Sequence, residues 1–239
     1  MRLCIDIGNT FEKIAVFDCR FQRYFHRTEF IVEELLANIA SQYKIDCAIL
    51  CSTKLLRADL LASLEKICPL TILETNTPLP IKNLYETPDT LGKDRIASVT
   101  AAHHLFPLEN NMVISAGTCI TVDVIDKDGN YQGGNIHPGI AMRLRAMHEF
   151  TQKLPLVEAV YKEGYIGKNT SHALQNGAVR GAIWEISSFI ARVQQDYEHP
   201  NLILTGGDSK FFEDHTNFKI FALPNLVLVG LNEILQYNS

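Results

Sequence analysis

One order of elements occurs twice in this chain: an apolar strand, a glycine-containing turn, a second strand and then a third. The first copy covers residues 2–26 and the second covers residues 112–136. The turn between the first two strands is Gly8-Asn9-Thr10 in the first copy and Gly117-Thr118 in the second. Sequence identity between the copies is weak, so the pattern carries the argument. It predicts two domains of related topology with their glycine turns at corresponding places.

Further strands alternate with apolar stripes at helical spacing outside these two copies. The remaining expected strands are 48–51, 70–73, 201–205 and 219–222, and the expected helices are 32–43, 56–67, 93–105, 140–150, 170–197, 210–216 and 226–237. This alternation predicts an α/β fold with mixed sheets flanked by helices. A polar break after Pro107 separates an N-terminal domain, residues 1–110, from a C-terminal domain, residues 111–239. The proline-rich stretch 76–91 is expected to be an irregular loop beside a site.

Composition restricts the partners and the compartment. A net charge of −5 argues against nucleic acid or an acidic membrane surface as the main partner. No apolar run reaches the length of a membrane span. The six cysteines form no Cys-x-x-Cys pair, and most lie in apolar runs. Such cysteines are typical of small core residues, so we expect a reduced, cytoplasmic compartment.

A carboxylate and a polar turn follow the first strand, in the pentapeptide Asp6-Ile7-Gly8-Asn9-Thr10. Gly8 lets the backbone approach a ligand closely, and the amides that follow can point at a phosphate. Asp6 could hold Mg²⁺ through water, because Mg²⁺ prefers few carboxylates and several waters. Lys13 lies where a cation could meet phosphate oxygens. Taken alone, the pentapeptide describes a hairpin with a polar turn equally well.

Two more motifs suit the chemistry of phosphates and nucleotides. Gly92-Lys93-Asp94-Arg95 begins the expected helix 93–105, where a carboxylate between two cations tends to stay ionised. Gly206-Gly207 ends the expected strand 201–205, where bare backbone lets a flat ring or a sugar lie close. The alternatives are a charged, capped helix start and an ordinary strand-to-helix turn.

The three glycine turns, in this order, resemble those of the acetate kinase, sugar kinase, Hsp70 and actin superfamily. There the first two turns cradle ATP phosphates and the third flanks adenosine. Over nearly its full length the chain more specifically resembles the type III pantothenate kinases. The motifs that carry the resemblance are DIGNTFEK (Asp6–Lys13), LYETPDTLGKDR (Leu84–Arg95), AGTCITVD (Ala116–Asp123), GGNIHPGI (Gly133–Ile140), TQKLP (Thr151–Pro155), GKNTSHALQNG (Gly167–Gly177) and LTGGD (Leu204–Asp208).

The resemblance implies two related ribonuclease H-like domains of the actin/sugar-kinase type, with the active site in the cleft between them. It implies an ATP-dependent kinase that phosphorylates the primary hydroxyl of pantothenate to give 4'-phosphopantothenate, the first step of coenzyme A biosynthesis. It also implies a homodimer, and ATP with Mg²⁺ as the phosphoryl donor. No nucleic acid and no membrane is expected as a partner.

Roles carry over to matching positions. Asp94 becomes the base that accepts the proton of the pantothenate hydroxyl. The other expected pantothenate contacts are Tyr85, Gly92, Lys93, Arg95 and Thr170, and the expected ATP contacts are Asp6, Ile7, Gly8, Asn9, Thr10, Phe11, Glu12, Lys13 and Thr118. Gly92 would permit close approach of the substrate, and Thr170 would reach over from the partner subunit. The alternatives are that Tyr85 anchors the proline-rich loop, that Thr170 is a helix N-cap and that Thr118 is a plain turn residue. His137 is interpreted as a structural histidine.

One position departs from the family pattern. The family carries Asp before the second Gly-Thr turn, where it helps to bind an activating K⁺ or NH₄⁺, and this chain has Ser115. A hydroxyl can ligate a monovalent ion but brings no charge, and Asp123 is the nearest carboxylate along the chain. Ser115 therefore favours an alternative function, a regulatory relative that binds nucleotide without turnover. Another small-molecule kinase of the superfamily is a further alternative, against which the Gly-Lys-Asp-Arg and Thr-x-x-Leu-Pro motifs argue.

Overall fold

The computed structural model describes all 239 residues, which form two compact units. Unit 1 comprises Met1–Leu108, Lys127–Gly133 and Asn225–Ser239, and unit 2 comprises Glu109–Asp126 and Gly134–Pro224. One boundary lies close to the break expected from the sequence near residue 110. Two segments of the second half of the chain pack with unit 1: a turn with the first residues of the strand β9 (Asn130–Pro138), and the C-terminal helix.

Unit 1 is built on a mixed five-stranded sheet. Its strands are β1 (Arg2–Ile7), β2 (Glu12–Asp18), β3 (Phe21–Thr28), β4 (Cys47–Ser52) and β5 (Leu70–Ile72). They lie in the order β3-β2-β1-β4-β5, with β1 antiparallel to β2 and parallel to β4. The central strand β1 is buried on both faces, which explains its nearly continuous apolar sequence. The predicted mixed sheet is therefore confirmed.

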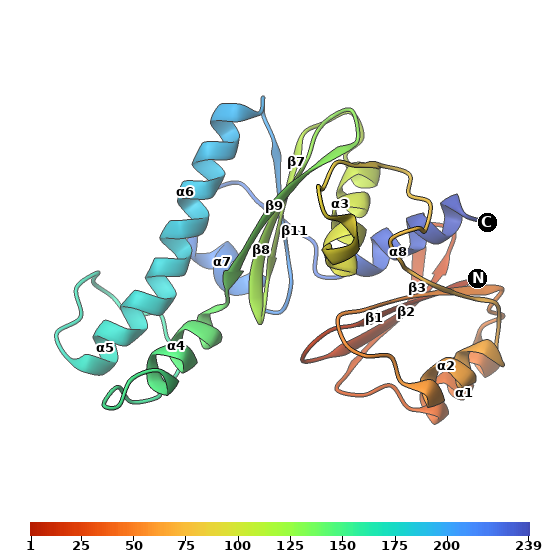
Figure 1. The fold of residues 1–239 in the computed structure, drawn as a ribbon, viewed down its shortest axis with the longest axis horizontal. Helices are drawn as coiled ribbons and strands as arrows, with labels where there is room; N and C mark the ends of the chain where they lie inside the picture. The colour runs from red at the N-terminus through yellow and green to blue at the C-terminus, as the bar shows by residue number, and fades with distance from the viewer. The chain divides into compact units, whose positions relative to one another are not determined.

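Helices cover both faces of this sheet. On one face α1 (Glu33–Gln42) and α2 (Ala58–Glu65) lie together, as Figure 1 shows. Side chains alternate along β1, so Leu3, Ile5 and Ile7 pack in the core beneath α1 and α2. Cys4 and Asp6 point to the opposite face, where α3 (Lys93–Leu105) and α8 (Leu226–Tyr237) pack.

The α3–α8 contact brings two helices together at the level of their backbones. A Cβ atom on Gly230 of α8 would lie 1.8 Å from the carbonyl oxygen of Ala97 on α3. His104 Nδ1 of α3 also lies 3.0 Å from Glu233 Oε2 of α8. This contact attaches the C-terminal helix to unit 1.

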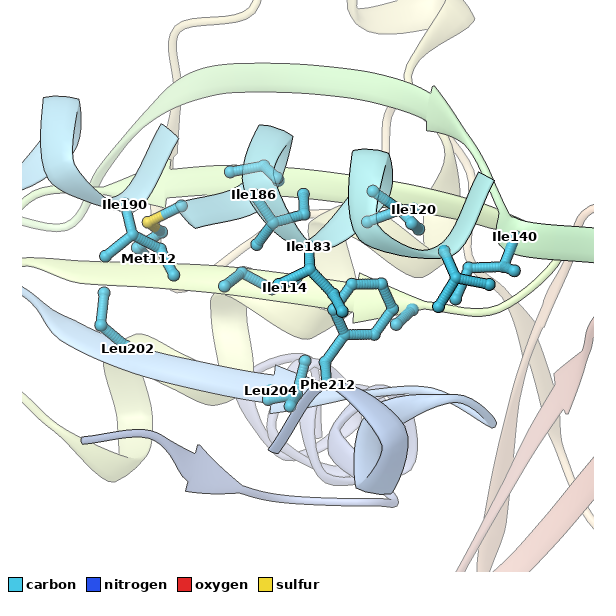
Figure 2. Close-up of a cluster of buried hydrophobic side chains, with 14 of the residues drawn as sticks. Met112, Ile114, Ile120, Ile140, Ile183, Ile186, Ile190, Leu202, Leu204 and Phe212 are labelled. Carbon is cyan, nitrogen blue, oxygen red and sulfur yellow. The ribbon is translucent and has the colours of Figure 1, made fainter. Parts of the chain in front are cut away.

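Unit 2 is a second mixed sheet with helices packed on one face. Its strands are β7 (Asn111–Ala116), β8 (Cys119–Ile125), β9 (Asn130–Pro138), β10 (Asn201–Thr205) and β11 (Phe221–Ala222), in the order β11-β10-β7-β8-β9. Its helices are α4 (Ile140–Glu149), α5 (Thr170–Gln175), α6 (Gly181–Asp196) and α7 (Ser209–His215). Figure 2 shows Ile183, Ile186 and Ile190 of α6 packed over Met112 and Ile114 of β7.

Two expected segments differ in detail. The helix expected over 170–197 contains a π-helical segment, Asn176–Arg180, between α5 and α6, because an extra residue is accommodated in that turn. The loop expected over 76–91 contains the short strand β6 (Lys82–Asn83), which pairs with the first residues of β9, and a 3₁₀ turn, Pro88–Thr90. None of the helices combines the length and apolarity that crossing a bilayer would require.

We expect Gly230→Ala to destabilise the protein by roughly 3 kcal/mol, because the new methyl group would force α3 and α8 apart. Chemical denaturation followed by circular dichroism measures this free energy of unfolding. Gly181→Ala is the matched control, since its Cβ atom would meet nothing within 4 Å and alanine favours a helix. Equal stability of the two variants would contradict the proposed closeness of the helices.

Candidate functional site

The carboxylate of Asp6 is the central group of the candidate site in unit 1. Asp6 is 5% exposed and lies opposite Lys13 on β2 and Cys51 on β4. Lys13 Nζ lies 3.7 Å from Asp6 Oδ2, and the Cys51 thiol donates to Asp6 Oδ1 over 3.5 Å. Burial raises the pKa of Asp6, Lys13 opposes this shift, and the charge of Asp94 adds to it. Two carboxylates, Asp6 and Asp94, therefore share one region of unit 1.

Burial also controls the thiol beside Asp6. It raises the pKa of Cys51 well above the ordinary value, and the nearby carboxylates of Asp6 and Asp94 raise it further. The thiol is therefore protonated at neutral pH and acts as a donor. All six cysteines of the chain are free.

Asp94 lies in the first turn of α3, and its carboxylate folds back over the helix start. Its Oδ1 atom accepts a hydrogen bond from the Arg95 backbone N–H over 2.9 Å. A Cβ atom on Gly92 would lie 2.7 Å from that same Oδ1 atom. Gly92 therefore makes room for the Asp94 carboxylate itself, a role distinct from the expected one of admitting substrate.

Tyr85 and Arg95 lie together in the same unit. The guanidinium of the buried Arg95 is 5.6 Å from the centre of the Tyr85 ring. Tyr85 stacks on Tyr131 of β9 with ring centres 6.1 Å apart, and Leu84 N–H donates to the Tyr131 carbonyl. The proline-rich loop is thus attached to β9 next to α3. The Lys93 side chain has a different partner, since its Nζ donates to Thr75 Oγ1 over 2.9 Å.

The first glycine turn connects β1 to β2 with little room for side chains. Gly8 N–H donates to the Phe11 carbonyl over 3.1 Å, and a Cβ atom on Gly8 would lie 2.9 Å from that oxygen. Asn9 and Thr10 are exposed at its tip. The Phe11 ring lies against Arg27, whose guanidinium is 3.6 Å from the ring centre.

Two residues of the expected ATP-binding motif face the other side of the sheet. Ile7 is buried in the core beneath α1 and α2. Glu12, which pairs with Ile7, accepts bonds at Oε2 from Ile31 N–H (2.6 Å) and from Arg57 Nη2 (3.3 Å). A ligand on the face of Asp6 and Lys13 could therefore contact Ile7 and Glu12 only through their backbone atoms.

We expect Glu12→Gln to lower the free energy of unfolding by about 1.5 kcal/mol, because it weakens a buried charge-assisted hydrogen bond. The KM for ATP should stay within about twofold of the wild-type value, a factor worth only a few tenths of a kcal/mol. Lys13→Gln, on the opposite face of the same strand, is the matched contrast and should raise that KM with less effect on stability. Urea titrations and steady-state kinetics on both variants check this, and a selective loss of ATP affinity in Glu12→Gln would contradict it.

Three backbone segments of unit 2 converge on the second glycine turn. Gly206, with φ of +97°, packs so closely that a Cβ atom would lie 2.1 Å from the Ala116 carbonyl oxygen, which also accepts a bond from Asp208 N–H. A Cβ atom on Gly139 would lie 2.2 Å from the Gly117 carbonyl oxygen. Gly139 N–H donates to the Thr118 carbonyl, and α4 begins at the next residue. The second and third glycine turns and a helix N-terminus therefore meet at the end of β7.

Ser115 lies in a row of hydroxyl groups across three strands. It pairs with Thr121 on β8 and with Thr205 on β10. The buried Asp123 is on the same face, two pairs further along the ladder, opposite Val113. No group of three or more His, Cys, Asp or Glu side chains suited to a metal ion forms anywhere in the 239 residues.

Thr170 is the exposed first residue of α5, and the helix cap is its neighbour. Asn169 Oδ1 accepts the bond from His172 N–H over 2.9 Å, so the alternative interpretation of Thr170 as the N-cap is wrong. His137 has a structural partner, since its Nδ1 lies 2.9 Å from Glu185 Oε1. Burial tends to raise the pKa of Glu185, but the hydrogen bonds with Arg143 and His137 outweigh this effect and lower the pKa below its usual value.

Solved structures define the class to which this fold belongs. A protein from Listeria monocytogenes described as an N-acetylmannosamine kinase is 14% identical, with a TM-score of 0.56 over 100% of this chain and 99% of its own. A Campylobacter jejuni protein described as a Baf family transcriptional activator is 20% identical, with a TM-score of 0.65 over 99% of this chain and 98% of its own. The predicted actin/sugar-kinase class of fold is confirmed.

Sequence relatives identify the family within this class. The model of the family described as type III pantothenate kinase matches residues 2–192. A type III pantothenate kinase of Bacteroides fragilis is 44% identical over 100% of this chain and 99% of its own length. The chain belongs to the type III pantothenate kinase family, as its motifs predicted.

Proposed function

We propose that this chain transfers the γ-phosphate of ATP to the primary hydroxyl of pantothenate, giving 4'-phosphopantothenate in the first step of coenzyme A biosynthesis. Membership of the family supports the reaction. The structural observation that carries the proposal is the gathering of Asp6, Asp94, Arg95 and Tyr85 in unit 1. A phosphoryl transferase needs a base, a cation beside the phosphoryl oxygens and a carboxylate for Mg²⁺.

In this mechanism Asp94 accepts the proton of the pantothenate hydroxyl as that oxygen attacks the γ-phosphorus, and the bond to the β-phosphate oxygen breaks. Arg95 stabilises charge on the phosphoryl oxygens or binds the substrate carboxylate, because its planar fork suits either group. Tyr85 and Thr170 contact pantothenate. Gly92 lets the Asp94 carboxylate take its place over the start of α3.

The donor set of unit 1 fits Mg²⁺. A divalent cation held by Asp6 through water would offset the negative charge that Asp94 adds near Asp6, one cause of the raised pKa of Asp6. Mg²⁺ binds through one or two carboxylates, waters and substrate phosphates, so a larger protein ligand cluster is not required. When bound, the ion screens the charge of the phosphates. Asp6 would hold it through water.

Backbone groups of the glycine turns are the proposed contacts of the nucleotide. The amides of Asn9 and Thr10, together with Thr118, would contact the phosphates, and the Gly206-Gly207 turn would flank adenosine. The expected contact of the Gly8 amide is not proposed, because this N–H donates to the Phe11 carbonyl. Convergence of the last two turns on the end of β7 supports this assignment. The nearby N-terminus of α4 adds a backbone site that favours anions.

We expect pantothenate-dependent release of ADP in a coupled assay with Mg²⁺, and a loss of at least ~10²-fold in kcat for Asp94→Asn, the usual scale for a general base. Binding of ATP should survive the substitution. Asp59→Asn on the exposed side of α2 is the control. Full activity of Asp94→Asn would refute the base. Binding of nucleotide without turnover in the unmodified protein would favour a regulatory relative, the function that Ser115 also favours.

We propose that the monovalent-cation site of the family is weakened here. The row formed by Ser115, Thr121 and Thr205 offers neutral oxygens, and Asp123 is a diagonal neighbour rather than a direct one. Neutral hydroxyls compensate less of the free energy of dehydrating K⁺ or NH₄⁺ than a carboxylate does, so the ion should bind more weakly.

Activity should therefore stay nearly flat when K⁺ or NH₄⁺ replaces Na⁺ at constant ionic strength. Ser115→Asp should introduce dependence on K⁺, because it supplies the missing charge. Initial rates in chloride salts of the three cations measure both effects. Strong activation of the unmodified protein by K⁺ would overturn the proposal and point to Asp123 as the compensating ligand.

We also propose a homodimer in the cytoplasm. Large apolar side chains are exposed on unit 2, among them Phe150, Tyr165, Ile166 and Trp184. Burying such residues against a second copy would remove apolar surface from water. The free state of all cysteines suits a reducing compartment.

A further inference from the structure

We propose that Cys51 is a positioning residue for the phosphoryl-transfer site, because its thiol holds one oxygen of the Asp6 carboxylate. The inference rests on the proposed function, in which Asp6 serves the Mg²⁺–ATP complex. It adds a residue to the site that lies outside all the motifs by which the family resemblance was recognised. Its basis is the arrangement of three neighbouring strands.

The strands β2, β1 and β4 place three side chains in one row. Lys13 pairs with Asp6 across the antiparallel contact, and Cys51 pairs with Asp6 across the parallel contact. Lys13 Nζ lies 3.7 Å from Oδ2, and Cys51 Sγ lies 3.5 Å from Oδ1. Each carboxylate oxygen therefore has its own partner, supplied from opposite sides.

This two-sided arrangement fixes the rotation of the carboxylate about its last bond. Without Cys51, the only donor identified at either oxygen would be Lys13, and the group could turn toward the ammonium. Asp6 and Cys51 are both buried, at 5% and 1% exposure, so water cannot readily replace the thiol. A thiol is also a weak donor, so it orients the oxygen while leaving lone pairs for a water of the Mg²⁺ shell.

The arrangement assigns Cys51 no nucleophilic role. Its thiol is buried and lies beside carboxylates, an environment that disfavours the thiolate needed for covalent chemistry. Cys4 provides an internal comparison. It is a buried thiol on the same face of β1, two residues before Asp6. Cys4 shares the packing environment of this face but has no hydrogen bond to Asp6.

The test compares Cys51→Ala, Cys51→Ser and Cys4→Ala in the full-length protein. We expect Cys51→Ala to lower kcat by about tenfold with an unchanged KM for pantothenate, the effect of one weak hydrogen bond to a charged group. Cys51→Ser should restore kcat to within about threefold, because its hydroxyl can donate to the same oxygen. Cys4→Ala should keep the wild-type kcat.

Two kinds of result in this comparison overturn the proposal. Wild-type kcat in Cys51→Ala shows that the thiol orients nothing. Equal losses in Cys51→Ala and Cys51→Ser, or in Cys51→Ala and Cys4→Ala, show a packing effect only. If the unmodified protein has no pantothenate-dependent turnover, the proposed function fails separately. In that case, calorimetric titration with Mg²⁺–ATP compares the affinities of the same three variants. We expect about tenfold weaker binding for Cys51→Ala, and affinities close to that of the unmodified protein for Cys51→Ser and Cys4→Ala.

Discussion

Bare backbone packed on bare backbone is the constraint on which unit 2 depends. The carbonyl groups of Ala116 and Gly117 are approached so closely by Gly206 and Gly139 that no side chain fits at either glycine. Strand β10, the junction of β9 with α4 and the end of β7 must therefore meet at one point. Backbone hydrogen bonds from Gly139 N–H to the Thr118 carbonyl and from Asp208 N–H to the Ala116 carbonyl hold the three segments in place. Segments far apart in the chain can pack this closely because the glycines have no Cβ atom.

Unit 1 is organised differently, around a buried charge. Alternation along β1 and β2 sends Asp6 and Lys13 to one face, and Ile7 and Glu12 to the other. One continuous motif thus supplies polar groups to the site and anchors the sheet to α1 and α2. Placing Asp6 between a cation and a thiol limits the cost of burying a carboxylate near Asp94.

The similarity to solved structures at low sequence identity shows the fold alone. The same architecture occurs in a protein described as an N-acetylmannosamine kinase and in one described as a transcriptional activator, both at low identity. Function must therefore be argued from the site. In this chain unit 1 holds the acidic pair Asp6 and Asp94, and unit 2 places Ser115 in a row of hydroxyls.

The sequence by itself determined the order of elements, the two related halves and the family, because periodicity and turn chemistry are properties of neighbouring residues. The bounds of α3 and α8 were even predicted to the residue. Tertiary structure decided which partners Glu12 binds and that α8 packs with unit 1. It also made Cys51 a neighbour of Asp6. These outcomes depend on strand register and on contacts between distant segments, which no local pattern encodes.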